Sequence, residues 1–272
     1  MTAARDRSLR MPRFAANVST MFPDRPVAEC FEAARAAGFA AVEYLFPYAE
    51  DPGEIATRLR ATGIRMILVN TPLGDAAGGE RGLAAVPGRQ TDFRTHFDEA
   101  LRYAVALDIP MVHVMAGVVA QAQRKEAEAV FIDNVRHAAD TAAMHGIRIL
   151  LEPLNHQDTP GYFITLTAET RRLIERIGRD NVRLQYDLYH RQIMEGNLAR
   201  GLADNLDVIG HIQFSSVPGR HEPQYGEVNM AYLFDVCDRL GYDGWIGCEY
   251  RPMTTTDEGL SWGRCYGLGA VQ

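Results

Sequence analysis

Short apolar segments alternate with longer amphipathic segments along the chain, and this alternation limits the folds open to it. The apolar segments predict strands at residues 13–18, 40–46, 64–70, 111–115, 147–152, 182–187, 208–213 and 245–249. The intervening segments predict helices at residues 26–37, 53–62, 91–107, 125–145, 167–177, 198–205, 230–240 and 257–262. Consecutive strand–helix units form right-handed parallel crossovers, and eight of them in 272 residues favour an α/β fold of the closed (β/α)8 barrel type over an open doubly wound sheet.

Four consecutive predicted strands end in a side chain that offers an oxygen ligand. Glu152 is followed by Pro153, which cannot continue a central strand, and the next three strands end in Asp187, Gln213 and Glu249. In neighbouring parallel strands these side chains converge at the C-terminal face of a barrel, where active sites lie. A lone carboxylate at a strand end is usually a helix cap or a salt-bridge partner, and Gln213 has the alternative of bonding a loop. Four such ends together predict a shared site for a hard divalent cation, Mg²⁺ or Mn²⁺.

Further polar residues near the same face are predicted to bind a substrate. Three carboxylates around a divalent ion leave net negative charge, so an acidic substrate needs positive charge nearby. Arg220, in the loop after the seventh strand, is predicted to bind a substrate carboxylate; the alternative is a solvated surface arginine. His190, at the start of the loop after the sixth strand, is predicted to contact a substrate oxygen, with helix capping or support of a ligand as the alternative. Asn70 and His113, at the ends of the third and fourth strands, are predicted substrate contacts.

Composition and charge argue against several classes of protein. The formal net charge is −7 and the isoelectric point is near 5.6, which disfavours a broad basic surface for nucleic acid. No apolar run matches a signal peptide or approaches the ~20 residues of a membrane span, so we expect a cytoplasmic protein that binds no membrane. The four cysteines lack C-x-x-C spacing, which predicts neither a disulfide framework nor a thiolate zinc site. Residues 71–90, rich in glycine, are predicted to form a lid or rim over the barrel mouth.

Seven segments make the chain similar to the hydroxypyruvate isomerase family and its close relative, the 2-oxo-tetronate isomerases. They are MPRFAAN at 11–17, EYLFPY at 43–48, GERG at 79–82, PGR at 87–89, EPLNH at 152–156, DLYH at 187–190 and GWIGCEY at 244–250. The resemblance implies a xylose-isomerase-like TIM barrel with a divalent metal at Glu152, Asp187, Gln213 and Glu249. It also implies two glutamates that act as proton acceptor and donor. Because it begins at residue 11, residues 1–10 are expected to be a disordered extension or the result of a misplaced start, and residues 11–272 a single domain.

Other segments bear on the substrate. Residues 152–161 resemble the hydroxypyruvate enzyme, whereas residues 112–119 and 220–223 also resemble the tetronate enzyme. In the glycine-rich segment, Asp75 is followed by alanine, where the hydroxypyruvate enzyme tends to have tryptophan. Both small anionic oxo acids are therefore retained as substrates.

The leading hypothesis is that the protein converts hydroxypyruvate to tartronate semialdehyde through a cis-enediolate. Glu152 and Glu249, on the fifth and eighth strands, flank the substrate, so one accepts a proton from C3 and the other donates one to C2. The sequence leaves open which glutamate is the base. Alternatives are isomerisation of a four-carbon 2-oxo acid, 3-epimerisation of a ketose and, less favoured, cleavage of DNA at abasic sites or sugar-acid binding without catalysis. Assembly into a homo-oligomer also stays open.

Overall fold

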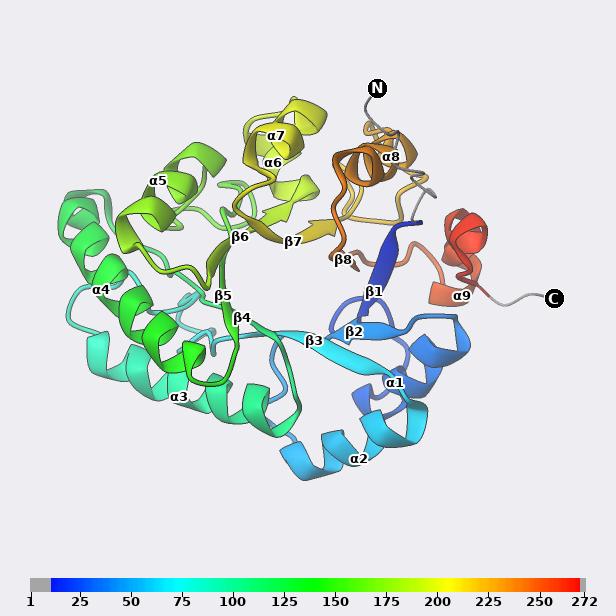
Figure 1. The fold of residues 1–272 in the computed structure, drawn as a ribbon, viewed down its shortest axis with the longest axis horizontal. Helices are drawn as coiled ribbons and strands as arrows, with labels where there is room; N and C mark the ends of the chain where they lie inside the picture. Colours follow the sequence, from blue (N-terminus) through cyan, green and yellow to red (C-terminus); the bar gives the residue numbers. More distant parts are fainter. Residues whose placement is uncertain (1–10, 270–272) are drawn as a thin grey trace, which may run out of the picture.

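The predicted barrel is confirmed by the computed structural model, which describes residues 11–269. Within them, eight parallel strands pair in sequence order and β8 closes the ring against β1 (Figure 1). Their bounds are β1 Arg13–Asn17, β2 Ala41–Glu43, β3 Arg65–Asn70, β4 Met111–His113, β5 Arg148–Leu151, β6 Val182–Asp187, β7 Ile209–Phe214 and β8 Trp245–Cys248. The prediction of a disordered extension at residues 1–10 lies outside the described residues.

The helices form an outer ring around the strands (Figure 1). Their bounds are α1 Val27–Ala36, α2 Pro52–Thr62, α3 Gln90–Ala106, α4 Arg124–Ala143, α5 Thr167–Ile177, α6 Leu188–Met194, α7 Leu198–Asn205, α8 Met230–Leu240 and α9 Thr256–Gly259, with 3-10 turns η1 Gln121–Gln123 and η2 Leu260–Tyr266. Gly63 ends α2 in the left-handed conformation, as its position in the sequence predicts. Between residues 11 and 269, no helix is both long and apolar enough to cross a membrane.

The structure contains one helix that the sequence pattern does not predict. α6 begins directly after β6, so His190 lies in a helix and not at the start of a loop. Asp187 caps this helix, because its Oδ1 accepts a hydrogen bond from the backbone N–H of Tyr189 at 2.8 Å. With seven residues, α6 is too short to show a helical period of apolar side chains.

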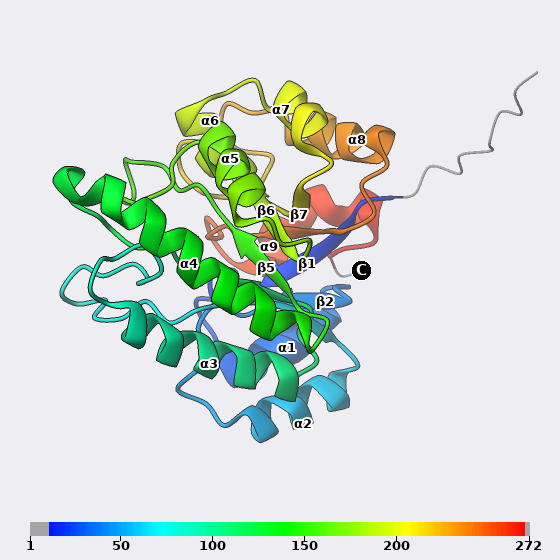
Figure 2. The ribbon, with the colours of Figure 1, turned by 60° about the vertical axis from the view of Figure 1, so that its left-hand side comes forward.

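The two ends of the described chain meet where the barrel closes. Trp262 and Tyr266 of η2 pack against Phe14 of β1, each with ring centroids 5.1 Å apart, and Phe234 of α8 packs on the same ring at 5.0 Å. Figure 2 shows the C-terminal segment next to β1. Aromatic contacts of this kind each add about 0.5–1.5 kcal/mol beyond the area they bury, so they stabilise the β1–β8 seam.

The predicted lid at residues 71–90 is anchored at its second half. Residues 75–79 are exposed, whereas Leu83 and Ala84 are buried against the barrel. The side chain of Asn134 in α4 donates a hydrogen bond to the carbonyl oxygen of Ala84 at 2.9 Å. The segment is therefore a rim whose second half belongs to the core, and only its first half projects into solvent.

Candidate active site

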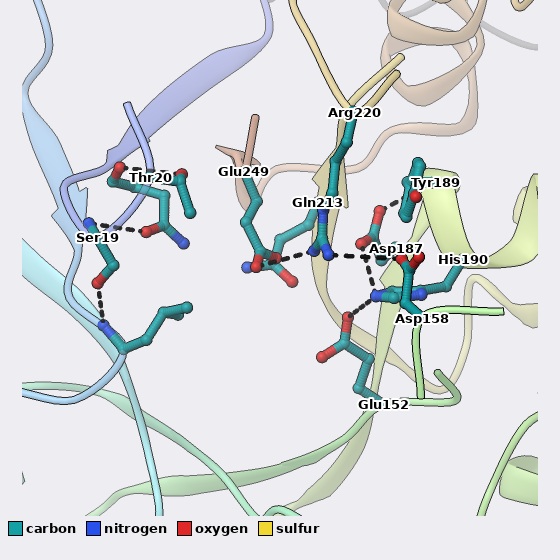
Figure 3. A network of polar contacts seen from close by, with 12 residues as sticks. Ser19, Thr20, Glu152, Asp158, Asp187, Tyr189, His190, Gln213, Arg220 and Glu249 are labelled. Carbon is teal, nitrogen blue, oxygen red and sulfur yellow. Dashed lines mark hydrogen bonds and ion pairs between the residues drawn. The ribbon is translucent and has the colours of Figure 1, made fainter. Parts of the chain in front are cut away.

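Oxygen-bearing side chains from four neighbouring strands meet at the C-terminal end of the barrel (Figure 3). Glu152 directly follows β5, Asp187 is the last residue of β6, and Glu249 directly follows β8. Gln213 is the penultimate residue of β7 and not its end, because the strand continues to Phe214. The sheet register sets Asp187 directly opposite Gln213. The structure thus brings all four predicted ligands together.

Burial and repulsion from neighbouring carboxylates raise the pKa of the three carboxyl groups. Desolvation raises the pKa of Glu152 well above its ordinary value, and the charges of Glu249 and Asp187 add to the shift. Desolvation likewise raises the pKa of Asp187 to about 6 and that of Glu249 to about 8, while the positive charge of Arg220 opposes both shifts. Three carboxyl groups with raised pKa values need a nearby cation before all of them ionise at neutral pH.

The carboxylates also present oxygens to which no hydrogen bond is made. Glu152 Oε1 and Asp187 Oδ2 are buried, and neither accepts a hydrogen bond from the described residues. One ligand atom from each of Glu152, Asp187 and His190 lies within 4.8 Å of the other two. Because its two carboxylates also carry unpaired oxygens, this buried cluster can hold a metal, with His190 beside the carboxylates.

His190 reaches this cluster from α6 as a neutral hydrogen-bond donor. Its Nδ1 accepts a hydrogen bond from the backbone N–H of Asn155 at 3.1 Å, and burial lowers the pKa of the ring well below its ordinary value. The single ring proton is therefore on Nε2, which lies 3.6 Å from Asp187 Oδ2 and 4.0 Å from Glu152 Oε1. A protonated Nε2 donates a hydrogen bond and does not coordinate a metal. This tautomer favours a contact with substrate.

Arg220 places its positive charge among the acidic side chains. Its Nη2 donates a hydrogen bond to Glu249 Oε1 at 3.0 Å, and its Nη1 lies 3.8 Å from Asp158 Oδ2. The guanidinium also stacks on the ring of Tyr189, 4.8 Å from the centroid. The backbone of Arg220 is left-handed, with φ 55°, and its N–H donates to the carbonyl oxygen of Ser216 at 2.8 Å. Arg220 is therefore a fixed part of the site and not a solvated surface residue.

His113 and Asn70 carry polar atoms that no described residue satisfies. They end β4 and β3 and are paired in the sheet register. His113 Nδ1 lies 3.4 Å from Glu152 Oε2, burial lowers the pKa of the ring to about 3, and neither ring nitrogen makes a hydrogen bond to the described residues. Asn70 Oδ1 is also buried and unpaired. Buried polar atoms are normally hydrogen-bonded, so these positions remain available to a ligand.

Sequence reasoning misses three polar residues inside the barrel. Gln185 Nε2 donates hydrogen bonds to Glu152 Oε2 at 2.9 Å and to Gln213 Oε1 at 2.5 Å. Glu43 Oε2 accepts a hydrogen bond from Gln213 Nε2 at 2.8 Å, and Glu43 Oε1 lies 2.5 Å from His211 Nε2. Gln185 and His211 each precede a predicted ligand by two residues, and the strand period of two puts both on the same barrel face as that ligand. The two-residue strand period was therefore the sequence signal that could have identified Gln185 and His211 as residues of the site.

Comparison with known proteins agrees with this geometry. Residues 31–265 match the family described as xylose isomerase-like TIM barrel, which is most of the chain. The chain belongs to this family. Members of the family to which it is similar are named after isomerase reactions, so the hydroxypyruvate isomerase resemblance seen in the sequence is confirmed.

Individual relatives align over nearly the whole chain. The 2-oxo-tetronate isomerase of Cupriavidus necator is 48% identical over 257 residues, which are 94% of this chain and 99% of that protein. The hydroxypyruvate isomerase of Escherichia coli is 41% identical over 253 residues, which are 93% and 98% of the two chains. A crystal structure described as an AP endonuclease, family 2, from Brucella melitensis is 49% identical with a TM-score of 0.93, and the match covers 94% of this chain and all of that one. The protein is an isomerase, as its named enzyme relatives are.

Proposed function

We propose that the protein interconverts hydroxypyruvate and tartronate semialdehyde and that it uses Mg²⁺ or Mn²⁺. The observation that carries the proposal is the pair Glu152 and Glu249, which approach one cluster from different strands (Figure 3). One glutamate accepts a proton from C3 of hydroxypyruvate, which leaves a cis-enediolate. The other donates a proton to C2, and the proton of the C3 hydroxyl passes to the oxygen on C2. Atoms and charge then balance.

The electrostatics of the two glutamates suit this transfer. A general acid or base works best when its pKa lies near the operating pH. Burial moves the pKa of Glu152 and Glu249 upward, away from that of a solvated carboxylate. Glu249, with a pKa of about 8, can therefore both hold and release a proton near neutral pH, which a solvated glutamate does poorly.

The same carboxylates provide the ligands for the proposed cation. Glu152, Asp187 and Glu249 would hold it together with the amide oxygen of Gln213, and the unpaired oxygens of the first two fit this role. Carboxylate and amide oxygens are the donors that Mg²⁺ and Mn²⁺ prefer. When bound, the cation supplies Lewis-acid polarisation of the substrate carbonyl. His190 is outside this ligand set because its protonated Nε2 donates to a substrate oxygen.

Recognition of an anionic substrate is assigned to Arg220. Its guanidinium uses Nη2 to bond Glu249 and retains other N–H donors for a substrate carboxylate. The unpaired atoms of His113 and Asn70 are proposed to bond the remaining substrate oxygens. The proposed ligand is thus a small 2-oxo acid with a hydroxyl group on the adjacent carbon.

The test is an NMR assay of hydroxypyruvate in D₂O with metal-stripped protein and with Mg²⁺ or Mn²⁺ restored. We expect tartronate semialdehyde, with deuterium at the receiving carbon, only when metal is present. Glu152→Gln and Glu249→Gln should each lose about 10²–10⁴-fold in turnover. Glu128→Gln is the matched control, because Glu128 pairs with Arg172 on the outer helices. Turnover like that of the wild type in either site variant would refute the two-glutamate mechanism.

Isomerisation of 2-oxo-tetronate is the second candidate, favoured by the 48% identity to an enzyme of that name. The two acids differ by one carbon, and the same pair of glutamates serves both. Comparison of kcat/KM for the two acids with the same preparation decides which is preferred. A neutral ketose in the same panel tests 3-epimerisation, since such a substrate offers no carboxylate to Arg220.

DNA cleavage at abasic sites is a third candidate because of the description given to the Brucella structure. Against it, the chain has a net charge of −7, and the site gathers the carboxyl groups of Glu152, Asp187 and Glu249 around the guanidinium of Arg220. Such a site repels the phosphate backbone. A nicking assay on duplex DNA with one abasic site should give no product, and metal-dependent nicking would overturn this expectation.

A further inference from the structure

A fully buried carboxylate, Glu43, lies beside Gln213 but is not among the proposed cation ligands. It is the last residue of β2. Its Oε2 accepts hydrogen bonds from Asn17 Nδ2 at 3.1 Å and from Gln213 Nε2 at 2.8 Å, and its Oε1 lies 2.5 Å from His211 Nε2. One carboxylate therefore connects β2 with β1 and β7 across the interior of the barrel.

The side chain of Glu43 has room in the barrel because the residue of β8 next to it, Gly247, has no side chain. Gly247 of β8 lies opposite Gln213 in the sheet register. A Cβ atom on Gly247 would lie 2.0 Å from Glu43 Oε1 and 2.7 Å from its carboxyl carbon. A side chain at position 247 would displace the Glu43 carboxylate, so the glycine provides room for it and no special backbone conformation is involved. Four strands contribute to the setting of Glu43.

Glu43 dictates which end of the Gln213 amide faces it. Glu43 Oε2 is a hydrogen-bond acceptor for both Asn17 Nδ2 and Gln213 Nε2, so Gln213 turns its NH₂ group toward Glu43 and its oxygen away. That oxygen accepts a hydrogen bond from Gln185 Nε2, which also donates to Glu152 Oε2 at 2.9 Å. A chain of hydrogen bonds therefore runs from Glu43 through the side-chain amides of Gln213 and Gln185 to Glu152, a carboxylate of the proposed cation site.

We propose that Glu43 is a positioning residue that makes Gln213 present its oxygen, and not its nitrogen, to the cation. The inference rests on the proposed function, because it takes Gln213 as a cation ligand. A flipped amide would set the Gln213 oxygen against the Glu43 carboxylate and would turn an N–H donor toward the cation. Both contacts are repulsive, so the charge and the position of Glu43 exclude the flipped state.

Two substitutions of Glu43 separate position from charge. Glu43→Gln keeps the shape but offers an acceptor and a donor, so Gln213 is satisfied in either direction. Glu43→Asp keeps the charge but is one methylene shorter and loses the contact with Gln213. We expect both variants to bind Mn²⁺ about 10–100-fold more weakly than the wild type. The readout is the electron paramagnetic resonance signal of free Mn²⁺ during titration of metal-stripped protein. Wild-type affinity in Glu43→Asp would overturn the proposal.

A double substitution supplies the rescue. In Glu43→Gln with Gln213→Glu, position 213 has two oxygens and no nitrogen, so it cannot present the wrong atom. Mn²⁺ affinity should return to within a few-fold of the wild type. Asn17 loses its acceptor, so the melting temperature of the metal-free protein need not recover. If Glu43→Gln alone does not fold, the comparison of this double variant with the wild type carries the test. A folded double variant that binds Mn²⁺ as weakly as Glu43→Asp overturns the proposal.

Two further measurements separate the proposal from its rivals. Asn134→Ala removes a buried hydrogen bond to the carbonyl oxygen of Ala84, outside the site, and should lower the melting temperature without changing Mn²⁺ affinity. Equal loss of Mn²⁺ affinity in Asn134→Ala would show that general destabilisation is the cause and would overturn the role of Glu43. A wild type that binds no Mn²⁺ overturns the proposed function itself. Wild-type binding that persists unchanged in Glu43→Gln overturns only the inference about Glu43.

Discussion

The metal-free protein should lose stability as pH rises, and Glu249→Gln should reduce this loss. The pKa of Glu249 is raised from 4.5 to about 8 in the folded protein, first by burial and then by the charge of Asp187. The folded state therefore binds this proton more tightly than the unfolded chain does. The resulting stabilisation is complete at pH values below the pKa of this group in the unfolded chain. It is lost as pH rises through the pKa of the group in the folded protein. We expect the free energy of unfolding to fall between about pH 5 and pH 8.

The size of this effect follows from the pKa shift. Each pH unit inside the window changes the free energy of unfolding by about 1.4 kcal/mol for one group. Glu249 is only 9% exposed, so solvent screens it little. Its contribution lost between pH 5 and pH 8 is on the order of 4 kcal/mol. Asp187, with a pKa of about 6, adds to the loss only in the lower part of the range. In Glu249→Gln the new side chain does not titrate. The substitution also removes the Glu249 charge, which contributes to the raised pKa of Glu152.

The assay is urea unfolding of chelator-treated protein at about pH 5, 6, 7 and 8, followed by circular dichroism. The wild type should lose stability steadily over this range, and Glu249→Gln should lose less, with the remaining loss coming from Glu152 and Asp187, whose pKa values burial also raises. Glu128→Gln serves as control, because Glu128 pairs with Arg176 and Arg172 on the outer helices and should leave the slope unchanged. Parallel slopes for the wild type and Glu249→Gln, or a wild type that gains stability with pH, would refute the reasoning.

Three further substitutions test the substrate contact, the seam and the rim. Arg220→Met should lower kcat/KM for hydroxypyruvate by about 10–100-fold through a higher KM, since a charged hydrogen bond is worth about 1.5–3 kcal/mol; unchanged steady-state kinetics would contradict it. Phe214→Ala, which removes a buried ring packed 5.5 Å from Trp262, should cost about 3–5 kcal/mol in urea unfolding. A cost below about 1 kcal/mol would show that the aromatic cluster is not a stabilising core. Gly82→Ala should lower the melting temperature, because φ is +100° and the new Cβ would lie 2.3 Å from the carbonyl oxygen of Met115; an unchanged value would contradict the tight packing of the rim.

The candidate site was predictable where its signal was local. Glu152, Asp187 and Glu249 each stand where an apolar strand stops, and a stop of this kind can be read from neighbouring residues alone. His190 was placed in a loop because α6 is short and begins at a residue that is also a predicted ligand. Gln185 was missed because it lies inside the strand segment, where a polar residue interrupts the apolar pattern without marking its end.

The sequence by itself determined the eight strand–helix units, the closed barrel they form and the acidic residues at the ends of the fifth, sixth and eighth strands. These follow from the periodicity of apolar residues and from the glycine, proline and charged residues that end helices and strands, both of which are local signals over a few residues. Only the tertiary structure decided that Glu43 bonds Gln213 across 170 positions of sequence, and that His190 carries its proton on Nε2. The physical reason is that the direction of a hydrogen bond depends on the partner at its other end, and barrel closure brings those partners together.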